Sequence, residues 1–508
     1  MPGPGFDAVV DFLERGALGG LAERVDTHAA IVLLAGERAY KLKRPVRYSF
    51  LDFTALAARE AALRHELALN RRTAPELYVR VLPVTAGPDG GLVLDGKGTP
   101  VEWLLEMRRF PADAQLDRIA AAGGLRPELV DALADVIAKA QAEAPPRPDQ
   151  GGAAAMRVVA EGNAEDLRAA VPEVFAADGV DALVASTRER LASIAGLLDR
   201  RRAHGLVRHC HGDLHLANIV LLGDRPTLFD CIEFDDAIAC IDVLYDLAFL
   251  IMDLIEKGHP EAACRLLNRW LERTGDHGGL SLLPLFLSLR AVIRAKVLGL
   301  AVTQGAGTDP ADACRYLALG HAFLNPPAPF LVAIGGQSGT GKTTLARAVA
   351  HRIGAAPGAV ILRSDVIRKG RFGREPTDRL PPEAYVPAVS RQVFAAIAER
   401  AAECLTAGHA VIADAVYGTP EQRAGIAAAA ARCGVPFLGV WLEAPQATCA
   451  ARVTARTGDA SDADAAVVAR QGQNIDFGSV GWHRLRADRP IAEVAADVLA
   501  LLTDDMRC

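Results

Sequence analysis

Residues 336–343 read Gly336-Gln337-Ser338-Gly339-Thr340-Gly341-Lys342-Thr343 and fit the spacing G-x-x-x-x-G-K-S/T. The apolar run over 330–334 predicts a buried strand before them, and a helix is expected from Lys342 onward. Glycines in that setting let backbone N–H groups turn around a polyphosphate, and the helix N-terminus adds its positive dipole. A plain glycine turn would require neither the lysine nor the threonine. The stretch therefore predicts a phosphate-binding loop, with Lys342 on the β- and γ-phosphates and Thr343 on Mg²⁺. The residues expected to contact the nucleotide are Gly336, Gln337, Ser338, Gly339, Thr340, Gly341, Lys342, Thr343 and Thr344.

Strands and helices are expected to alternate beyond the loop, which predicts a parallel sheet with helices on both faces. Asp365 and Asp414 each follow an apolar run of this region, at 359–363 and 410–413. An open α/β sheet binds its ligand outside the carboxyl ends of its strands. Asp365 is therefore expected to meet an acceptor hydroxyl beside the γ-phosphate. Asp414 serves either the water shell of Mg²⁺ or the N-terminus of the next helix.

This half of the chain resembles the P-loop small-molecule kinases, a group that includes gluconate kinase, shikimate kinase, polynucleotide kinase and the zeta toxins. The resemblance covers about residues 330–505 and implies that Asp365 orients the substrate hydroxyl and that Arg368 holds the substrate. It also implies a lid that closes on ATP. Arg452 and Arg456 share one face of an expected helix. Their implied roles are ATP binding for Arg452 and contact with the transferring phosphoryl group for Arg456, the alternative being two solvent-exposed charges.

A second motif lies in the first half of the chain, within a region that is otherwise mostly helical. It reads His211-Gly212-Asp213-Leu214-His215-Leu216-Ala217-Asn218, and Leu228-Phe229-Asp230 follows. A carboxylate, an amide five residues later and a second carboxylate after a short hairpin are the groups that position an acceptor hydroxyl and hold Mg²⁺. A metal site made of His209, His211 and His215 is not favoured, because one strand and turn do not bring the three rings together easily.

These residues resemble the signature of the aminoglycoside phosphotransferase and choline kinase superfamily, and the resemblance extends over about residues 25–320. It implies that Asp213 is the catalytic base, that Asn218 and Asp230 bind Mg²⁺ and that His211 is a structural support. Asp242 and Asp246 match a downstream motif that braces the catalytic loop. The implied fold is a bilobal α+β domain, with an antiparallel-sheet N-lobe over 1–107 and a helical C-lobe over 108–322.

The same superfamily uses a lysine on the third strand and a glutamate on the following helix to hold the α- and β-phosphates. Lys41 and Lys43 alternate onto one face of an expected strand, so either can serve. Leu42-Lys43-Arg44-Pro45 is closer to the family pattern and favours Lys43. Glu66 is the expected partner on the helix, because its spacing to the break at Ala74-Pro75 fits the family.

Four further residues receive roles in this domain. Glu106 and Met107 end the last expected strand of the N-lobe, and the resemblance makes them the hinge whose backbone meets adenine. Glu233 and Asp235 follow Asp230 closely, where they either bind substrate or cap the next helix.

The composition agrees with a reducing, water-soluble setting. The net charge of -6 over 508 residues gives no reason to expect nucleic acid or an anionic membrane as a partner. The nine cysteines are scattered without a C-x-x-C pair, which favours free thiols. The most apolar stretch, 280–302, is interrupted by Pro284, Arg290, Arg294 and Lys296 and so predicts a core helix. With no signal peptide evident, the cytoplasm is the expected location.

The sequence thus predicts a bifunctional ATP- and Mg²⁺-dependent kinase that phosphorylates hydroxyl groups of small molecules such as sugars, sugar acids, aminoglycosides or nucleosides. Phe323-Leu324-Asn325-Pro326-Pro327-Ala328-Pro329 is the expected linker, and the α/β P-loop domain is expected over 330–508. Two alternatives stay open. The kinase-like half is a nucleotide or ligand sensor that regulates the P-loop kinase, or the chain is an NTPase switch that acts on protein partners.

Overall fold

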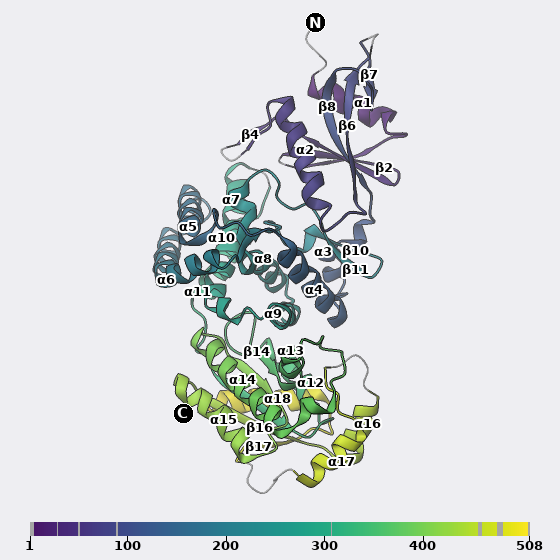
Figure 1. Ribbon diagram of the computed structural model, residues 1–508. Coiled ribbons are helices and arrows are strands. Elements are labelled where there is room, and N and C mark those ends of the chain that lie inside the picture. Colours follow the sequence, from purple (N-terminus) through teal and green to yellow (C-terminus); the bar gives the residue numbers. More distant parts are fainter. Residues whose placement is uncertain are drawn as a thin grey trace. The chain divides into compact units, whose positions relative to one another are not determined.

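The structure is a computed structural model that describes residues 5–27, 29–48, 51–87, 90–305, 307–455, 460–474 and 481–505 (Figure 1). The chain forms two compact units. Unit 1 comprises Met1–Glu161 and Ala195–Asp253, and unit 2 comprises Gly162–Ile194 and Leu254–Cys508. Three helices have residues in both units: α5 (Gly152–Ala169), α6 (Ala177–Ala203) and α8 (Val243–Glu256). Among the described residues, none of the helices combines the length and the apolarity that crossing a bilayer requires.

Unit 1 contains the predicted antiparallel sheet, whose strand order is β1-β2-β3-β8-β6-β7. Its strands are β1 (Glu23–Asp26), β2 (Ala30–Ala35), β3 (Arg38–Lys43), β6 (Tyr78–Ala86), β7 (Leu92–Leu94) and β8 (Pro100–Arg108). Helix α2 (Leu56–Asn70) packs on this sheet through Leu63, which is buried with Tyr78 and Leu105. A separate cluster buries Val9 and Val10 of α1 (Phe6–Phe12) against β2 and β3. The sheet is therefore covered by apolar side chains of two helices.

One predicted helix of this unit is wrong in its extent. The amphipathic pattern of 7–23 predicts one helix, but α1 ends at Phe12, the short π-helix η1 (Leu13–Ala17) follows, and 23–26 form strand β1. The physical reason lies at Gly16, whose φ of 131° is incompatible with a helix.

The remaining elements of unit 1 frame the second motif. The antiparallel pair β9–β12 and the hairpin β10–β11 lie on either side of the Asp213 segment, as the expected short strands around turns. The bounds are β4 (Arg47–Tyr48), β5 (Leu51–Asp52), η2 (Ala112–Ala114), α3 (Leu116–Ala121), α4 (Pro127–Glu143), β9 (Val207–His209), η3 (Leu216–Asn218), β10 (Ile219–Leu222), β11 (Arg225–Leu228), α7 (Asp236–Ala239) and β12 (Cys240–Asp242).

Unit 2 contains the predicted parallel sheet, in the strand order β14-β15-β13-β16-β17. Its strands are β13 (Leu331–Gly336), β14 (Val360–Arg363), β15 (Val411–Asp414), β16 (Phe437–Glu443) and β17 (His483–Arg486). Every residue of β13 is buried, as expected of a central parallel strand covered on both faces. The phosphate loop follows β13, and Asp414 ends the neighbouring strand β15. The topology thus brings the phosphate loop and Asp414 together at the carboxyl ends of neighbouring parallel strands.

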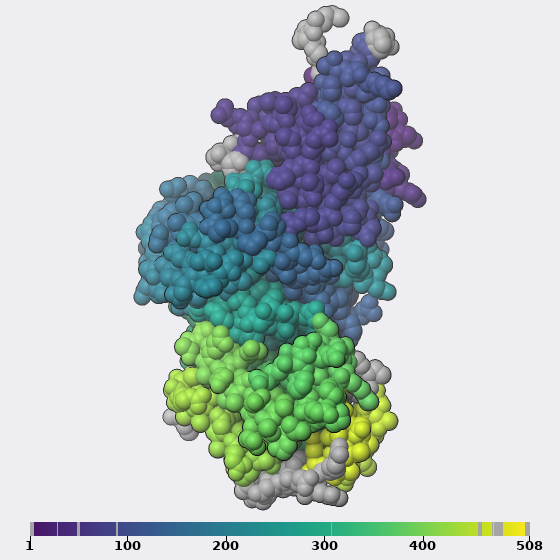
Figure 2. All heavy atoms as spheres, in the orientation of Figure 1, coloured from purple at the N-terminus to yellow at the C-terminus, as the bar shows by residue number. Residues whose placement is uncertain are grey.

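Helices α12, α14, α15 and α18 pack against strands of this sheet, and in the space-filling view the residues of the P-loop region are coloured from green to yellow (Figure 2). Helix α12 packs against α18, and α14 packs against α15. The bounds are α9 (Pro260–Thr274), η4 (His277–Leu282), α10 (Leu283–Thr303), α11 (Pro310–Leu324), α12 (Lys342–Ala350), α13 (Ser364–Arg371), η5 (Pro382–Tyr385), α14 (Pro387–Thr406), α15 (Pro420–Cys433), α16 (Gln446–Thr454), α17 (Ala465–Asn474) and α18 (Ile491–Asp505).

Helix α9 completes the edge of this sheet. Strand β14 is an edge strand, and the amide of Asn268 pairs with its backbone: Nδ2 donates to the carbonyl oxygen of Ala359 at 3.1 Å, and Oδ1 accepts from the N–H of Ile361 at 2.6 Å. Cys264, one turn earlier on α9, is buried in the same core as Ile334 and Leu345. One side chain thereby satisfies two backbone groups that a buried edge would leave without partners.

Candidate active sites

The phosphate loop has a conformation that only its glycines permit. Gly336, Gly339 and Gly341 have positive φ values of 137°, 85° and 94°. A Cβ on Gly339 would lie 2.4 Å from the carbonyl oxygen of Cys449. Lys342 Nζ donates to the carbonyl oxygens of Gly336 at 2.9 Å and Gln337 at 2.8 Å. The lysine therefore folds back over a tightly wound loop at the start of α12, as a polyphosphate cradle requires.

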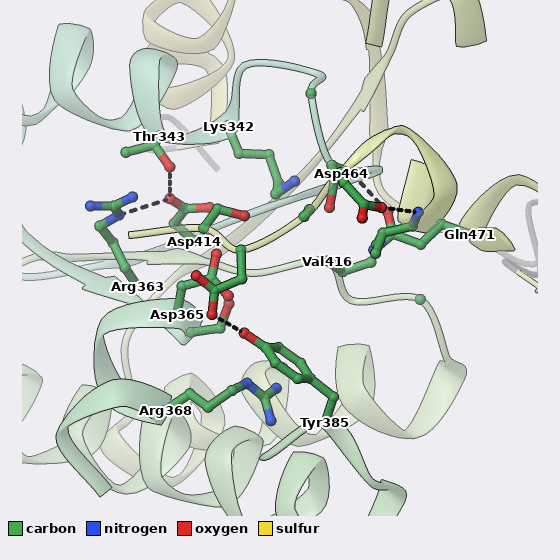
Figure 3. Close-up of a pocket in the computed structure, with 18 of the residues that line it drawn as sticks. Lys342, Thr343, Arg363, Asp365, Arg368, Tyr385, Asp414, Val416, Asp464 and Gln471 are labelled. Carbon is green, nitrogen blue, oxygen red and sulfur yellow. Dashed lines mark hydrogen bonds and ion pairs between the residues drawn. The ribbon is translucent and has the colours of Figure 1, made fainter. Parts of the chain in front are cut away.

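Thr343 and Asp414 meet at the end of the sheet. Thr343 Oγ1 donates to Asp414 Oδ2 at 2.5 Å, and Arg363 Nε lies 3.8 Å from the same oxygen (Figure 3). A hydroxyl and a carboxylate side by side are oxygen ligands of the kind that Mg²⁺ takes in phosphoryl-transfer sites. The structure thus brings together the two residues predicted to hold the metal in this half of the chain.

Asp365 lies in the first turn of α13, directly after β14. Burial raises the pKa of its carboxyl above the usual value, Arg363 lowers it and Asp414 raises it further. Arg368, one turn later, is buried, donates through Nη1 to the carbonyl oxygen of Ala384 at 2.6 Å, and has its guanidinium 5.0 Å from the ring centroid of Tyr385. Its buried Nε has no hydrogen-bond acceptor among the described residues. A buried polar atom normally has one, so a ligand group is the natural partner.

These residues line one cavity of about 1200 Å³ in unit 2. Lys342, Thr344, Asp365 and Arg368 all border it, and so does Arg452 on α16, which donates to the carbonyl oxygen of Ala487 at 3.0 Å. The cavity therefore extends from the phosphate loop to Asp365 and Arg368, the residues predicted to contact the acceptor substrate. Arg456, the other predicted lid arginine, lies outside the described residues.

Asp462 and Gln471, which follow the predicted lid arginines in the sequence, also line this cavity. Asp462 accepts from Tyr385 Oη at 2.6 Å, from the N–H of Leu380 at 3.0 Å and from Lys369 Nζ at 3.1 Å. Gln471 on α17 accepts from the N–H of Ser338 at 2.8 Å. These contacts join segments far apart in the sequence, so the partners of Asp462 and Gln471 emerge only from the fold.

In unit 1 the Asp213 segment forms a compact polar site. Asn218 Nδ2 donates to Asp213 Oδ2 at 2.9 Å, and His215 Nε2 lies 3.4 Å from the same oxygen. His211 is buried, with Nε2 2.8 Å from the carbonyl oxygen of Phe229. Asp213 and Asn218 thus converge as the signature predicted, while His211 contacts backbone, as expected of a support.

Three buried aspartates near this segment differ in what they contact. Arg201 binds both carboxylate oxygens of Asp242, at 2.7 and 2.9 Å, in a buried pair. Asp246 accepts from the N–H of Gly212 at 2.9 Å. Asp253, which sequence reasoning missed, accepts from the N–H of Leu216 at 2.9 Å. The backbone of the Asp213 segment is therefore held by the buried carboxylates of Asp246 and Asp253, whereas Asp242 pairs with Arg201.

The two candidate lysines of β3 point to the same cluster of acids. Lys41 Nζ lies 2.8 Å from Glu66 Oε1 and 2.5 Å from Asp230 Oδ1. Lys43 Nζ lies 2.6 Å from Glu66 Oε2 and 2.5 Å from Glu233 Oε1. Burial lowers the pKa of Lys41, but its carboxylate partners outweigh this and hold the pKa well above its usual value. Lys41 is the lysine that contacts the predicted metal ligand, whereas Lys43 is buried behind it.

The other residues predicted for this unit lie on β8 and after Asp230. Glu106 near the end of β8 accepts from Arg80 Nε at 2.8 Å, and Met107 is paired in the sheet with Ala39 and Tyr78. Glu233 is buried against Lys43, and Asp235 accepts from the N–H of Ala237 at 2.8 Å as the N-cap of α7. The capping alternative therefore describes the Asp235 side chain.

His209 does not form a possible metal site with His211 and His215 in the described part of the chain. Its nearest possible metal ligands are Asp236 and Cys240, and the three ligand atoms lie within 4.8 Å of one another. Arg147 Nη1, however, donates to Asp236 Oδ2 at 2.9 Å and to Cys240 Sγ at 3.1 Å. A protein cation therefore already neutralises this cluster.

Comparison with known proteins identifies both halves. Residues 34–283 match the family model "Phosphotransferase enzyme family", and residues 331–477 match the model "AAA domain". Over 454 residues the chain is 32% identical to the uncharacterized protein Rv2004c of Mycobacterium tuberculosis (strain H37Rv), covering 87% of this chain and 88% of that protein. An uncharacterized protein of Mycobacterium bovis, Mb2027c, matches to the same extent.

Two solved structures match parts of the chain at low identity. A gluconokinase from Sinorhizobium meliloti 1021 is 23% identical, with 35% of this chain and 93% of that chain covered and a TM-score of 0.26. A choline/ethanolamine kinase family protein from Mesorhizobium loti is 14% identical, with 60% and 89% covered and a TM-score of 0.39.

Proposed function

The chain belongs to the family of two-part proteins in which a phosphotransferase domain precedes a P-loop kinase domain, and we propose that it is a bifunctional kinase with two separate Mg-ATP sites. Both family matches indicate ATP-dependent phosphoryl transfer. The finer proposal is that each site phosphorylates a hydroxyl group of a small molecule, such as a sugar, sugar acid, aminoglycoside or nucleoside. One observation carries it for unit 2: the Asp365 carboxylate borders the same cavity as Lys342 and the Thr343–Asp414 pair.

In unit 2 Asp365 accepts the proton of the acceptor hydroxyl, whose oxygen attacks the γ-phosphorus while the bond from that phosphorus to the β–γ bridging oxygen breaks and ADP leaves. Lys342 and the loop N–H groups neutralise the charge that gathers on the phosphate oxygens. Thr343 and Asp414 would hold Mg²⁺, which supplies further neutralisation when bound. Arg368, whose Nε lacks an acceptor among the described residues, orients the substrate. Arg452, and Arg456 in the undescribed segment after it, close over the nucleotide.

In unit 1 Asp213 accepts the proton of the substrate's hydroxyl group. Asn218 and Asp230 would hold Mg²⁺ through their oxygens. Lys41 binds the α- and β-phosphates, and Glu66 fixes its ammonium. The geometry favours Lys41 over Lys43 because only Lys41 contacts both Glu66 and Asp230. Glu106 and Met107, at the end of β8, present their backbone to adenine. A purely regulatory role for this unit is less well supported, because the Asp213–Asn218 and Lys41–Asp230 contacts are the ones that catalysis requires.

The test is a phosphoryl-transfer screen over sugars, sugar acids, aminoglycosides and nucleosides with Mg-ATP. Asp213→Ala and Asp365→Ala each remove one proposed base, and each should lower transfer at its own site by a factor on the order of 10²–10⁴. If Asp213→Ala leaves the rate and the product set of the wild type unchanged, the two-site proposal is wrong and unit 1 is regulatory. If Lys342→Ala transfers phosphate at the full rate to every acceptor, the P-loop unit has no part in the reaction.

A further inference from the structure

A second cavity of about 370 Å³ lies in unit 2, behind the acceptor residues. Helix α9 forms one wall through Asn268 and Leu271, strand β14 and helix α13 form another, and Arg400 of α14 closes it. Its apolar lining includes Val366 and Ile367. No role in phosphoryl transfer uses these residues, so the cavity needs an explanation of its own.

Two polar groups in this cavity, the Arg400 guanidinium and Nε2 of His277, have no partner among the described residues. Arg400 is half-buried, and within the described part of the chain no carboxylate lies within ion-pair distance of it. His277 is 5% exposed and lines the cavity. Its Nδ1 lies 3.1 Å from the carbonyl oxygen of Gly275, so Nδ1 carries the proton and Nε2 is an acceptor. No described residue donates to Nε2. Burial lowers the pKa of His277 to about 4, so the ring is neutral near pH 7.

The charge of the lining selects the ligand. Three arginines, Arg363, Arg371 and Arg400, face one acid, Glu272, and that acid already pairs with Arg269 at 3.3 Å. The lining therefore favours an anion. A carboxylate suits it better than a phosphate, because Arg363 is engaged by Asp414 and Arg371 by Gln392, which leaves a single guanidinium for a bidentate contact. Nε2 of His277 calls for a hydroxyl or amine donor elsewhere on the ligand.

The cavity is coupled to the proposed acceptor site by one short helix. Helix α13 presents Asp365 and Arg368 to the large cavity, and Val366 and Ile367 to the small one. Arg363 lines both cavities. A ligand that packs against one side of α13 therefore changes the freedom of the residues on the other side, since packed interiors transmit displacement.

We propose that this cavity is a binding site for a small hydroxyl-bearing carboxylic acid, whose carboxylate binds Arg400, whose hydroxyl donates to His277 and whose apolar body packs against α13. Occupancy orders α13 and thereby the acceptor residues. The site is distinct from both Mg-ATP sites and does not depend on the identity of either acceptor substrate.

The test uses the full chain without ATP and 4-hydroxybenzoate as the probe, with binding measured by calorimetry and α13 monitored by hydrogen exchange. We expect saturable binding, protection of 363–371, and an affinity reduced about tenfold or more by Arg400→Gln, which removes a charged hydrogen-bond partner. Benzoate, which lacks the hydroxyl, and the methyl ester, which lacks the charge, should each bind more weakly. Arg391→Gln, an exposed arginine on the same helix that does not line the cavity, is the matched control and should bind as the wild type does.

Val366→Phe fills the cavity from α13 and should abolish binding while circular dichroism shows a folded chain. The proposal is overturned if the wild type does not bind the probe, if Arg400→Gln and Val366→Phe bind it as tightly as the wild type, or if binding leaves the exchange of 363–371 unchanged. None of these readouts requires turnover, so they are independent of the proposed kinase function.

Discussion

The ammonium group of Lys43 lies 2.5 Å from the carboxylate of Glu233, a residue that follows the predicted metal ligand Asp230 by three positions. The side chains are 5% and 4% exposed, so the pair is shielded from water. A second ion pair joins the same two segments. It links Lys41, two residues before Lys43, with Asp230, three residues before Glu233. Strand β3 therefore holds the Asp230 segment through two ion pairs, of which the Lys41 pair includes the predicted metal ligand Asp230.

The two lysines should accordingly fail in different ways when they are removed. Lys41→Met should lower transfer at the unit 1 site by a factor on the order of 10² or more, and it should destabilise the fold less than Lys43→Met, because Glu66 keeps Lys43 and the Asp230 side chain is 42% exposed. Lys43→Met leaves the buried carboxylate of Glu233 without its lysine, and breaking a buried pair costs about 3–5 kcal/mol of unfolding free energy. Initial rates and denaturant unfolding measure the two effects. Equal stability of the two variants would contradict this division.

The pH dependence of the unit 2 site should follow Asp365. The proton acceptor must be ionised, and burial raises the pKa of this carboxyl above its usual value. Activity is therefore lost as the pH falls through this raised pKa, at a higher pH than an exposed aspartate would give. Arg363 lowers the pKa of Asp365, so Arg363→Gln should move the acidic limb of the kcat/KM profile to higher pH. An acidic limb that stays in place in Arg363→Gln would argue against Asp365 as the titrating group.

Thr343 and Asp414 should govern the requirement for Mg²⁺ at the unit 2 site. Thr343→Val keeps the shape of the side chain but removes the hydroxyl that lies 2.5 Å from Asp414. We expect a higher Mg²⁺ concentration for half-maximal activity, by about tenfold, because one oxygen ligand is lost. Thr343→Ser retains the hydroxyl and serves as the control. A magnesium titration of the transfer rate that is identical in Thr343→Val and Thr343→Ser would exclude this role.

Asn268 should contribute to the stability of unit 2 through strand β14. Asn268→Leu leaves the carbonyl oxygen of Ala359 and the N–H of Ile361 buried without their partner, and each unsatisfied group costs about 1–3 kcal/mol. Urea unfolding and hydrogen exchange of 359–363 should both report the loss. Asn325→Leu is the matched control, because Asn325 makes the same bond to the carbonyl four residues earlier but is exposed. Similar destabilisation by both substitutions would sink the edge-strand explanation.

Features encoded within a few consecutive residues were predictable from the sequence. The phosphate loop, Asp213 with Asn218, and Asp365 after its strand were located because short motifs fix their local geometry, and the structure brings each group together. The parallel and antiparallel sheets followed from hydrophobic periodicity. The helix over 7–23 was predicted too long because a glycine's dihedral angle is not written in the apolar pattern.

Contacts between distant segments were not predictable in this way. Side chains alternate across a strand with a period of two, so Lys41 and Lys43 share a face, and the local pattern that favoured Lys43 does not show which lysine meets Asp230. Only the packing of the Asp230 segment against β3 gives Lys41 the metal ligand and Lys43 the buried Glu233. The same holds for Asp462, which joins Tyr385 and Lys369, and for Asn268, which reaches β14 across 91 residues.

The sequence by itself therefore determined that the chain joins two kinase-family domains, and it located two predicted sets of phosphoryl-transfer residues, each in a local motif. The tertiary structure decided which neighbouring charges serve those sets, and it built α9 into the edge of the P-loop sheet. The physical reason is the range of the forces involved. Backbone turns and strand or helix periodicity are set by adjacent residues, whereas burial, ion pairing and edge closure depend on groups that only the folded chain brings within a few ångströms of each other.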